Sequence, residues 1–257
     1  MDRWPVRLAI LGTLIASLRA TDDFRRIFYE DLANASHFQR EGVTTYSQLL
    51  FDVARQQVVV GARDNLYRLT LTSLTPLEHA SWPAPEDKSN TCQNKGQSVE
   101  DCRNYVKVLL TNGKSLFTCG TYAFSPWCTW REIENISSVT SEMSGAAMCP
   151  YSPRANVTAL LARGPTGGLF TGAPTDFSGA DPAICRTLAS PNLRTHQYDS
   201  RWLNDPQFVG SFETEDHVYF MFRESAVEYI NCGKVTRFNS RSTESLHNDL
   251  ESSIFYG

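Results

Sequence analysis

The sequence predicts an all-β fold and, within that class, a β-propeller. Convincing helical periodicity is missing after residue 20, and short extended runs fill the chain from Tyr46 onward. Asn112-Gly113 separates two such runs, which predicts a β-hairpin with a two-residue type I′ turn. Four apolar strands also end at marker residues spaced 59, 52 and 52 residues apart, namely Gly61, Gly120, Gly172 and Glu224. A period of about 50 residues is typical of propeller blades, although regular short strands also suit a β-sandwich.

The composition is that of a folded domain. The chain has 257 residues, a formal net charge of −4, and 41% hydrophobic and 20% charged residues. Lysine and arginine are scattered, so no basic stripe indicates binding to nucleic acid.

The N-terminus has the pattern of a secretory signal peptide. Arg3 and Arg7 form a basic region, and residues 8–18 are apolar. Eleven apolar residues are too few to cross a bilayer, and no later stretch is long and apolar enough to do so. We therefore expect residues 1–20 to be removed and the chain to be secreted without a membrane anchor. Three sequons predict N-glycosylation in that compartment, at Asn34, Asn135 and Asn156.

The extended runs are separated by Pro, Gly, Asn and Asp, as turns require. In the first unit they lie at residues 47–51, 57–60 and 65–71. Each later unit begins with a run that precedes the marked strand, at residues 104–110, 157–161 and 207–212. Residues 163–180 are rich in Gly, Pro and Ser, but the repeat predicts a strand between turns there and not a linker.

The seven cysteines fall into two groups. Cys92 and Cys102 are ten residues apart, and Cys119 and Cys128 are nine apart, at the two ends of the predicted hairpin. A zinc site would need Cys-x-x-Cys or close histidines, and neither is present, so two local disulfides are favoured in a secreted chain. The remaining cysteines, Cys149, Cys185 and Cys232, are left without an assigned pairing.

The cysteine-rich block resembles the first conserved block of the semaphorin sema domain. Further matches extend the resemblance from about residue 38 to residue 234, and the sequence of these segments is most similar to that of class 5 semaphorins. The matching segments are residues 92–96, 101–106, 119–128, 149–153, 199–209 and 218–224. The resemblance implies the N-terminal part of a sema β-propeller over residues 21–234, about four blades of seven. It also implies that residues 21–46 complete the last blade of the intact ring.

The segment after Lys234 departs from that family. Where the pattern would continue with Ser-Arg-x-Ala-Arg-x-Cys-Lys, residues 235–257 are rich in Ser, Asn and Glu and contain no cysteine. We expect this segment to be poorly ordered. A truncated splice form is one hypothesis for it.

The resemblance implies an extracellular axon-guidance ligand that binds a plexin-type receptor. Other expected partners are a second copy, in full-length relatives, and a glycosaminoglycan. The acidic segment 210–217 is the candidate contact, although a solvated turn is the simpler interpretation; its residues are Glu213, Glu215, Asp216 and His217.

Two alternatives compete with a signalling ligand. One is a non-signalling truncated product or decoy, because four blades leave two open faces and each repeat relies on its neighbours for burial. The other is a secreted propeller enzyme. No catalytic motif is present and the five histidines are dispersed, so we predict no catalytic residues, no metal site and no cofactor.

Overall fold

The structure is a computed structural model that describes residues 35–163, 167–195, 203–215, 217–226, 236–244 and 253–255. The chain divides into two units, Met1–Ser36 and His37–Gly257, and the fold below is that of the second unit. The predicted signal peptide at residues 1–20, together with Asn34, Asp216 and Cys232, lies outside the described residues.

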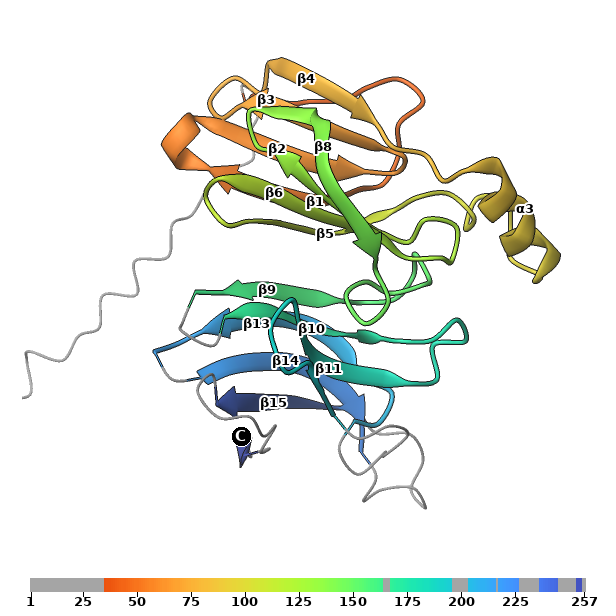
Figure 1. The fold of residues 1–257 in the computed structure, drawn as a ribbon, viewed down its shortest axis with the longest axis vertical. Coiled ribbons are helices and arrows are strands. Elements are labelled where there is room, and N and C mark those ends of the chain that lie inside the picture. The colour runs from red at the N-terminus through yellow and green to blue at the C-terminus, as the bar shows by residue number, and fades with distance from the viewer. Residues whose placement is uncertain are drawn as a thin grey trace, which may run out of the picture. The chain divides into compact units, whose positions relative to one another are not determined.

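Four antiparallel sheets of four strands each, which we call blades 1 to 4, make up this unit (Figure 1). Blade 1 holds β1 (Tyr46–Asp52), the short helix η1 (Val53–Arg55), β2 (Gln57–Ala62), β3 (Asn65–Thr70) and β4 (Pro76–Ser81). Blade 2 holds β5 (Val106–Thr111), β6 (Ser115–Gly120), β7 (Trp127–Glu132) and β8 (Asn135–Ser144). Blade 3 holds β9 (Thr158–Ala162), β10 (Gly168–Pro174), β11 (Pro182–Thr187) and β12 (Leu193–Arg194). Blade 4 holds β13 (Gln207–Glu213), β14 (His217–Ser225), β15 (Thr236–Glu244) and β16 (Ser253–Phe255).

Every blade pairs its strands in chain order, and the first strands of successive blades, β1, β5, β9 and β13, contact one another in turn. A succession of four-stranded meanders joined through their first strands is the arrangement of a β-propeller. The predicted fold class is therefore confirmed, and the sandwich alternative is wrong.

The marker glycines explain the sequence repeat. A Cβ atom at Gly61 would lie 2.5 Å from Val106 Cγ1, and one at Gly172 would lie 2.5 Å from the ring of Phe208. In both cases the second strand of one blade carries glycine where a side chain from the first strand of the next blade packs against it. Gly120 differs, because the side chain that a Cβ atom there would meet is that of Asn104, which precedes β5 in the same blade. The glycines of the repeat therefore mark positions where the backbone of one strand is closely approached by a side chain from another segment.

Apolar clusters fill the spaces between successive blades. The cluster between blades 1 and 2 consists of Val59, Leu66, Ala80, Trp82, Val106, Leu109, Leu116 and Ile136. The cluster between blades 2 and 3 consists of Val108, Phe117, Cys119, Cys128, Cys149 and Leu169. The cluster between blades 3 and 4 consists of Phe170, Ile184, Leu203, Phe208, Val218, Phe220 and Phe222. Alternating strand residues supply these contacts, as the pleat requires.

The turn at Asn112-Gly113 differs from the prediction. β5 and β6 do pair as a hairpin, but three residues, 112–114, connect them, and Gly113 alone among these has a positive φ, of 89°. The side-chain Oδ1 of Asn112 accepts hydrogen bonds from the backbone N–H groups of Lys114 and Ser115, at 2.9 and 2.7 Å. These Asx-type hydrogen bonds hold the turn in its conformation, whereas a type I′ turn would need a second residue with a positive φ.

Two parts of the segment 235–257, for which poor order was expected, form strands in blade 4. β15 pairs with β14 along its whole length, and β16 pairs with β15. Glu224 of β14 is only 2% exposed, and its carboxylate accepts a hydrogen bond from Arg237 Nη2 at 2.8 Å and another from Asn239 Nδ2. Polar composition suggested disorder, but these polar residues satisfy a buried acid.

One α-helix, α3 (Glu86–Asn94), was not expected from the sequence. Its buried residue is Cys92, so it has no apolar stripe to reveal its periodicity. In the described part of the chain, no helix is long and apolar enough to cross a membrane.

Candidate functional site

The turns of the blades lie at two ends of the strands. Because each blade is an antiparallel meander, its first and third turns fall at one end and its second turn at the other. We call the end where β1, β5, β9 and β13 finish the hairpin end. The opposite end, which carries the connections between blades and α3, we call the linker end.

Three of the residues predicted to contact a receptor, Glu213, Glu215 and His217, lie at the hairpin end. Glu213 ends β13, and its Oε1 accepts a hydrogen bond from the backbone N–H of Arg163 in blade 3, at 2.9 Å. His217 is half-buried, with its ring 5.9 Å from that of Tyr219, whereas Glu215 is exposed. Glu213 therefore connects blades 3 and 4 through this hydrogen bond, whereas the Glu215 side chain is exposed to solvent.

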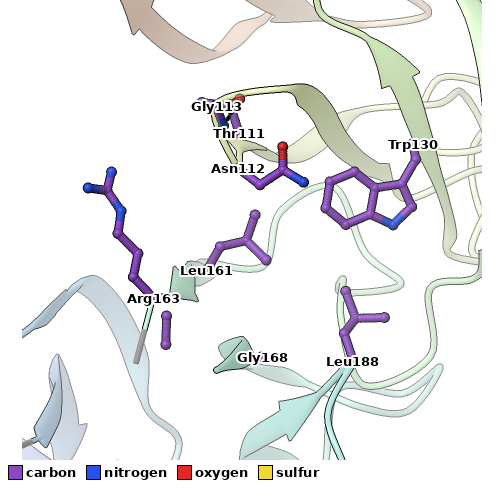
Figure 2. A pocket seen from close by; sticks show the side chains of 9 residues that line it. Thr111, Asn112, Gly113, Trp130, Leu161, Arg163, Gly168 and Leu188 are labelled. Carbon is purple, nitrogen blue, oxygen red and sulfur yellow. Dashed lines mark hydrogen bonds between the residues drawn. The ribbon is translucent and has the colours of Figure 1, made fainter. Parts of the chain in front are cut away.

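A pocket of 690 Å³ opens between blades 2 and 3 at the same end (Figure 2). Trp130 of β7 and Leu161 of β9 form two of its walls, and the Trp130 ring packs 4.8 Å from that of Phe117. Figure 2 shows the amide of Asn112 directed toward Trp130, and the guanidinium of Arg163 directed away from it. The remaining lining comes from Thr111, Gly113, Ala162, Gly168 and Leu188. No sequence pattern indicates this pocket, because its residues come from separate hairpins.

Two disulfides stabilise the linker end and blade 2. Cys92 in α3 is bonded to Cys102, with their Cα atoms 5.9 Å apart, so the bond closes the loop that follows the helix. Cys119 and Cys128 are bonded and lie directly opposite each other in β6 and β7. Both are the local pairs favoured by sequence spacing, and no zinc-type arrangement of these cysteines forms.

The disulfide-closed loop is also held by charged groups. Glu100 forms an ion pair with Arg63 of blade 1 and accepts a hydrogen bond from the Tyr105 hydroxyl at 2.9 Å. Burial, together with this contact to Glu100, raises the pKa of Tyr105 to about 12. On the other side, Asp101 pairs at 2.8 Å with Arg154, which lies in the segment that leads into blade 3. The loop is thus fixed to the segments that flank blade 2.

An aromatic–lysine patch borders this loop, and we define it as Lys88, Lys95, Phe124, Tyr151 and Phe177. The rings of Phe124 and Phe177 lie 5.1 Å apart, and Lys95 Nζ lies 5.0 Å from the centre of the Phe177 ring. These residues line a cavity of 330 Å³ that also reaches Cys92. Sequence reasoning missed the patch because its members come from α3 and the residue that follows it, the β6–β7 turn, the segment before β9 and the β10–β11 turn.

Comparison with known proteins identifies the family. Semaphorin 5c of Drosophila melanogaster is 52% identical over 219 residues, which covers 83% of this chain and 20% of the relative. Human Semaphorin-5A is 46% identical over 214 residues, with 83% of this chain and 20% of the relative covered. The chain belongs to the semaphorin family. No family model matches it.

This semaphorin chain spans about one fifth of the length of those relatives. Among solved structures, Drosophila Semaphorin 2a matches with a TM-score of 0.71 and 32% identity, over 78% of this chain and 36% of that one. A chain in the complex of Drosophila Plexin A with Semaphorin 1b matches with a TM-score of 0.70 and 32% identity, over 82% of this chain and 39% of that one. The blades described above are therefore those of a semaphorin sema domain.

The other sequence-predicted residues of this semaphorin chain lie apart from the patch. Asn135 and Asn156 are both exposed, and Asn156 Nδ2 donates a hydrogen bond to Gln207 Oε1 at 3.0 Å. Cys149 and Cys185 are buried free thiols; burial raises the pKa of both, that of Cys185 to about 11. Within the described ranges, no group of three or more His, Cys, Asp and Glu side chains could hold a metal ion.

Proposed function

We propose that this chain is part of an extracellular guidance ligand and that it binds a plexin-type receptor. The observation that carries the proposal is its likeness to the complex of Drosophila Plexin A with Semaphorin 1b, which extends over 82% of this chain. Two disulfides and a predicted signal peptide support an extracellular location, because disulfides persist in oxidising compartments. Homodimerisation and glycosaminoglycan binding, expected for full-length relatives, belong to the same proposal.

We place the main receptor contact on the aromatic–lysine patch. Aromatic and cationic side chains contribute most of the binding energy at typical protein interfaces. The disulfide and the ion pairs of Glu100 and Asp101 hold the neighbouring loop in one conformation, which lowers the entropy lost on binding. The complementary receptor surface would present acidic groups around an apolar side chain.

The acidic hairpin predicted from the sequence remains a second, peripheral contact in this proposal. Glu213 accepts a hydrogen bond within the fold, so Glu215 is the residue free to face a partner. An exposed charge of this kind changes the rate of association more than the strength of the complex.

Charge reversal tests the assignment. Immobilised plexin-type ectodomain is titrated with the secreted chain. Lys95→Glu is expected to raise the dissociation constant at least ~10-fold, because it places an acidic side chain on the patch. Lys114→Glu is the matched control, because it makes the same charge change at an exposed residue of the hairpin end. Lys114→Glu should stay within about twofold of the parent chain.

Three outcomes contradict the assignment. An equal loss for both lysine variants would mean a general charge effect. A loss for Glu215→Lys without one for Lys95→Glu would move the contact to the hairpin end. A folded, monodisperse chain that binds no plexin-type ectodomain would refute the proposed function itself.

We further propose that the chain acts by binding and not by catalysis. A growth-cone assay with the same preparation separates a signalling ligand from a decoy. A ligand changes growth-cone behaviour when added alone, whereas a decoy only reduces the response to an intact semaphorin added with it. Substrate turnover that survives Lys95→Glu would favour the enzyme alternative.

A further inference from the structure

The cavity beside the aromatic–lysine patch has a size and a lining that suit one side chain of a partner. At 330 Å³ it lies near the lower end of the range of ligand pockets. Phe124 is buried, and Tyr151 and Phe177 are half-buried, so their rings offer apolar surface that is already held in place. Aromatic rings bury large areas against one another and gain further from ring–ring contact. The walls therefore favour an aromatic side chain.

Two ammonium groups border the same cavity. Lys88 lies in the first turn of α3, and Lys95 directly follows the helix, seven residues later, so both lie on one side of it. Lys88 Nζ donates a hydrogen bond to Ser125 Oγ at 3.4 Å, whereas Lys95 Nζ lies over the Phe177 ring. Ser125 belongs to the β6–β7 turn and Phe177 to the β10–β11 turn. The two charges therefore lie at two different walls of the cavity.

Neither of these charges is neutralised within the fold. Among the residues that the structure describes, no carboxylate forms an ion pair with Lys88 or Lys95. An ammonium group has three hydrogen-bond donors, and Lys88 uses one of them, in a long bond to a hydroxyl. Of the described lining residues, Asp87 alone is acidic, and it is exposed to solvent. The cavity therefore combines aromatic walls with an excess of positive charge and free donors.

We propose that this cavity binds a sulfated tyrosine of the receptor. The tyrosine ring contacts the aromatic walls, and the sulfate ester accepts hydrogen bonds from Lys88 and Lys95, which are strong because donor and acceptor are both charged. Aspartate and glutamate would bring the charge without the ring, and unmodified tyrosine would bring the ring without the charge. The inference rests on the proposed function for the identity of the partner, and it adds the chemical group that the patch recognises.

Titration with a small probe tests the site without the receptor. N-acetyl-O-sulfotyrosine amide should bind the secreted chain at least ~10-fold more tightly than N-acetyltyrosine amide, because it alone offers the lysines a charged acceptor. Lys88→Gln with Lys95→Gln should abolish this preference but keep the weak binding of the unsulfated probe. Asp87→Asn should tighten binding of the sulfated probe, since it removes an opposing charge. The matched control is Lys114→Gln with Arg163→Gln, which removes two exposed charges at the hairpin end and should keep the preference.

Receptor made with and without tyrosine sulfation connects the site to the proposed function. Plexin-type ectodomain from cells that lack tyrosylprotein sulfotransferase should bind the parent chain at least ~10-fold more weakly than sulfated ectodomain does. The Lys88→Gln, Lys95→Gln variant should bind the two ectodomains alike.

The two proposals fail in different ways. Equal affinity of the parent chain for both ectodomains would overturn the inference and leave the proposed function standing. If neither ectodomain binds, the proposed function fails, and the probe titration still decides whether the cavity recognises a sulfated tyrosine. The inference is overturned there if the chain does not prefer the sulfated probe, or if the double lysine variant keeps the preference.

Discussion

The hairpin end and the linker end of the blades are built in different ways. At the hairpin end the connections are short, and their polar groups hold neighbouring blades together, as when Arg55 donates to the Gly113 carbonyl at 2.9 Å. At the linker end, residues 82–105 form one long connection that is ordered by a disulfide and by the ion pairs of Glu100 and Asp101. Its neighbouring aromatic and lysine side chains line a cavity.

The difference shows why visible charge is a poor guide to a binding surface. The acidic hairpin around Glu213 is conspicuous in the sequence, yet Glu213 serves the contact between blades 3 and 4. Lys95 and Phe177 are 82 residues apart in the sequence, yet they lie against each other. Long connections that are held rigid by a scaffold are well suited to binding, because ordering them costs little on association.

Removing the linker-end disulfide should have the largest effect. Replacing Cys92 and Cys102 by alanine is expected to lower the free energy of unfolding by about 2–4 kcal/mol, because the loop regains its freedom in the unfolded state. Receptor binding should weaken as well, since the patch adjoins Cys92. Denaturant unfolding and receptor titration measure the two effects.

The second disulfide supplies the control. Cys119→Ala with Cys128→Ala removes a bond within blade 2 that does not close the loop, so stability should fall while binding at low temperature is kept. Equal loss of binding in the two double variants would remove the distinction between the linker end and the rest of blade 2.

A carboxylate near the hairpin end should have the next largest effect. Glu78 of β4 accepts hydrogen bonds from the backbone N–H of Ile136 at 3.0 Å and of Ser137 at 2.9 Å, and it pairs with Arg68. Glu78→Gln should cost about 1–2 kcal/mol of unfolding free energy, because an amide NH₂ would face these donors. Receptor binding should not change.

The effect of Glu78 should depend on pH. Burial raises the pKa of its carboxyl, but hydrogen bonds from Ser137 and Ile136 and the charge of Arg68 outweigh burial and hold the pKa below 4.5. The stability that it contributes is therefore complete above the unfolded pKa and is lost as the pH falls through the lower folded pKa. The gap between parent and Glu78→Gln should accordingly be constant near neutrality and close in acid. A gap that widens in acid would contradict this assignment.

These contacts show what the sequence could and could not predict. The fold was predictable because Gly61 and Gly172 recur at the positions where the next blade packs, and because local pairs of cysteines bracket one hairpin. The patch was not predictable, since no local pattern links residues of α3 to Phe177. β15 was missed for a similar reason: Arg237 and Asn239 look like a solvated tail until Glu224 of β14 is placed beside them.

The smallest effect is expected at the predicted acidic hairpin. Glu213→Ala removes one acceptor for the backbone N–H of Arg163 and should cost about 0.5–1 kcal/mol, as a single partly exposed hydrogen bond does. Its receptor affinity should stay within about twofold of the parent chain. A large loss of affinity with unchanged stability would instead make Glu213 a contact residue, as the sequence suggested.

Hydrogen–deuterium exchange of the secreted chain, with and without a plexin-type ectodomain, tests the central claim most directly. Amide exchange slows where a partner covers or rigidifies the backbone. The patch assignment predicts new protection in residues 86–102, 121–126 and 175–181 at the linker end, and unchanged exchange in residues 112–114 and 213–215. Protection confined to the hairpin end, with unchanged exchange around Lys95 and Phe177, would contradict it.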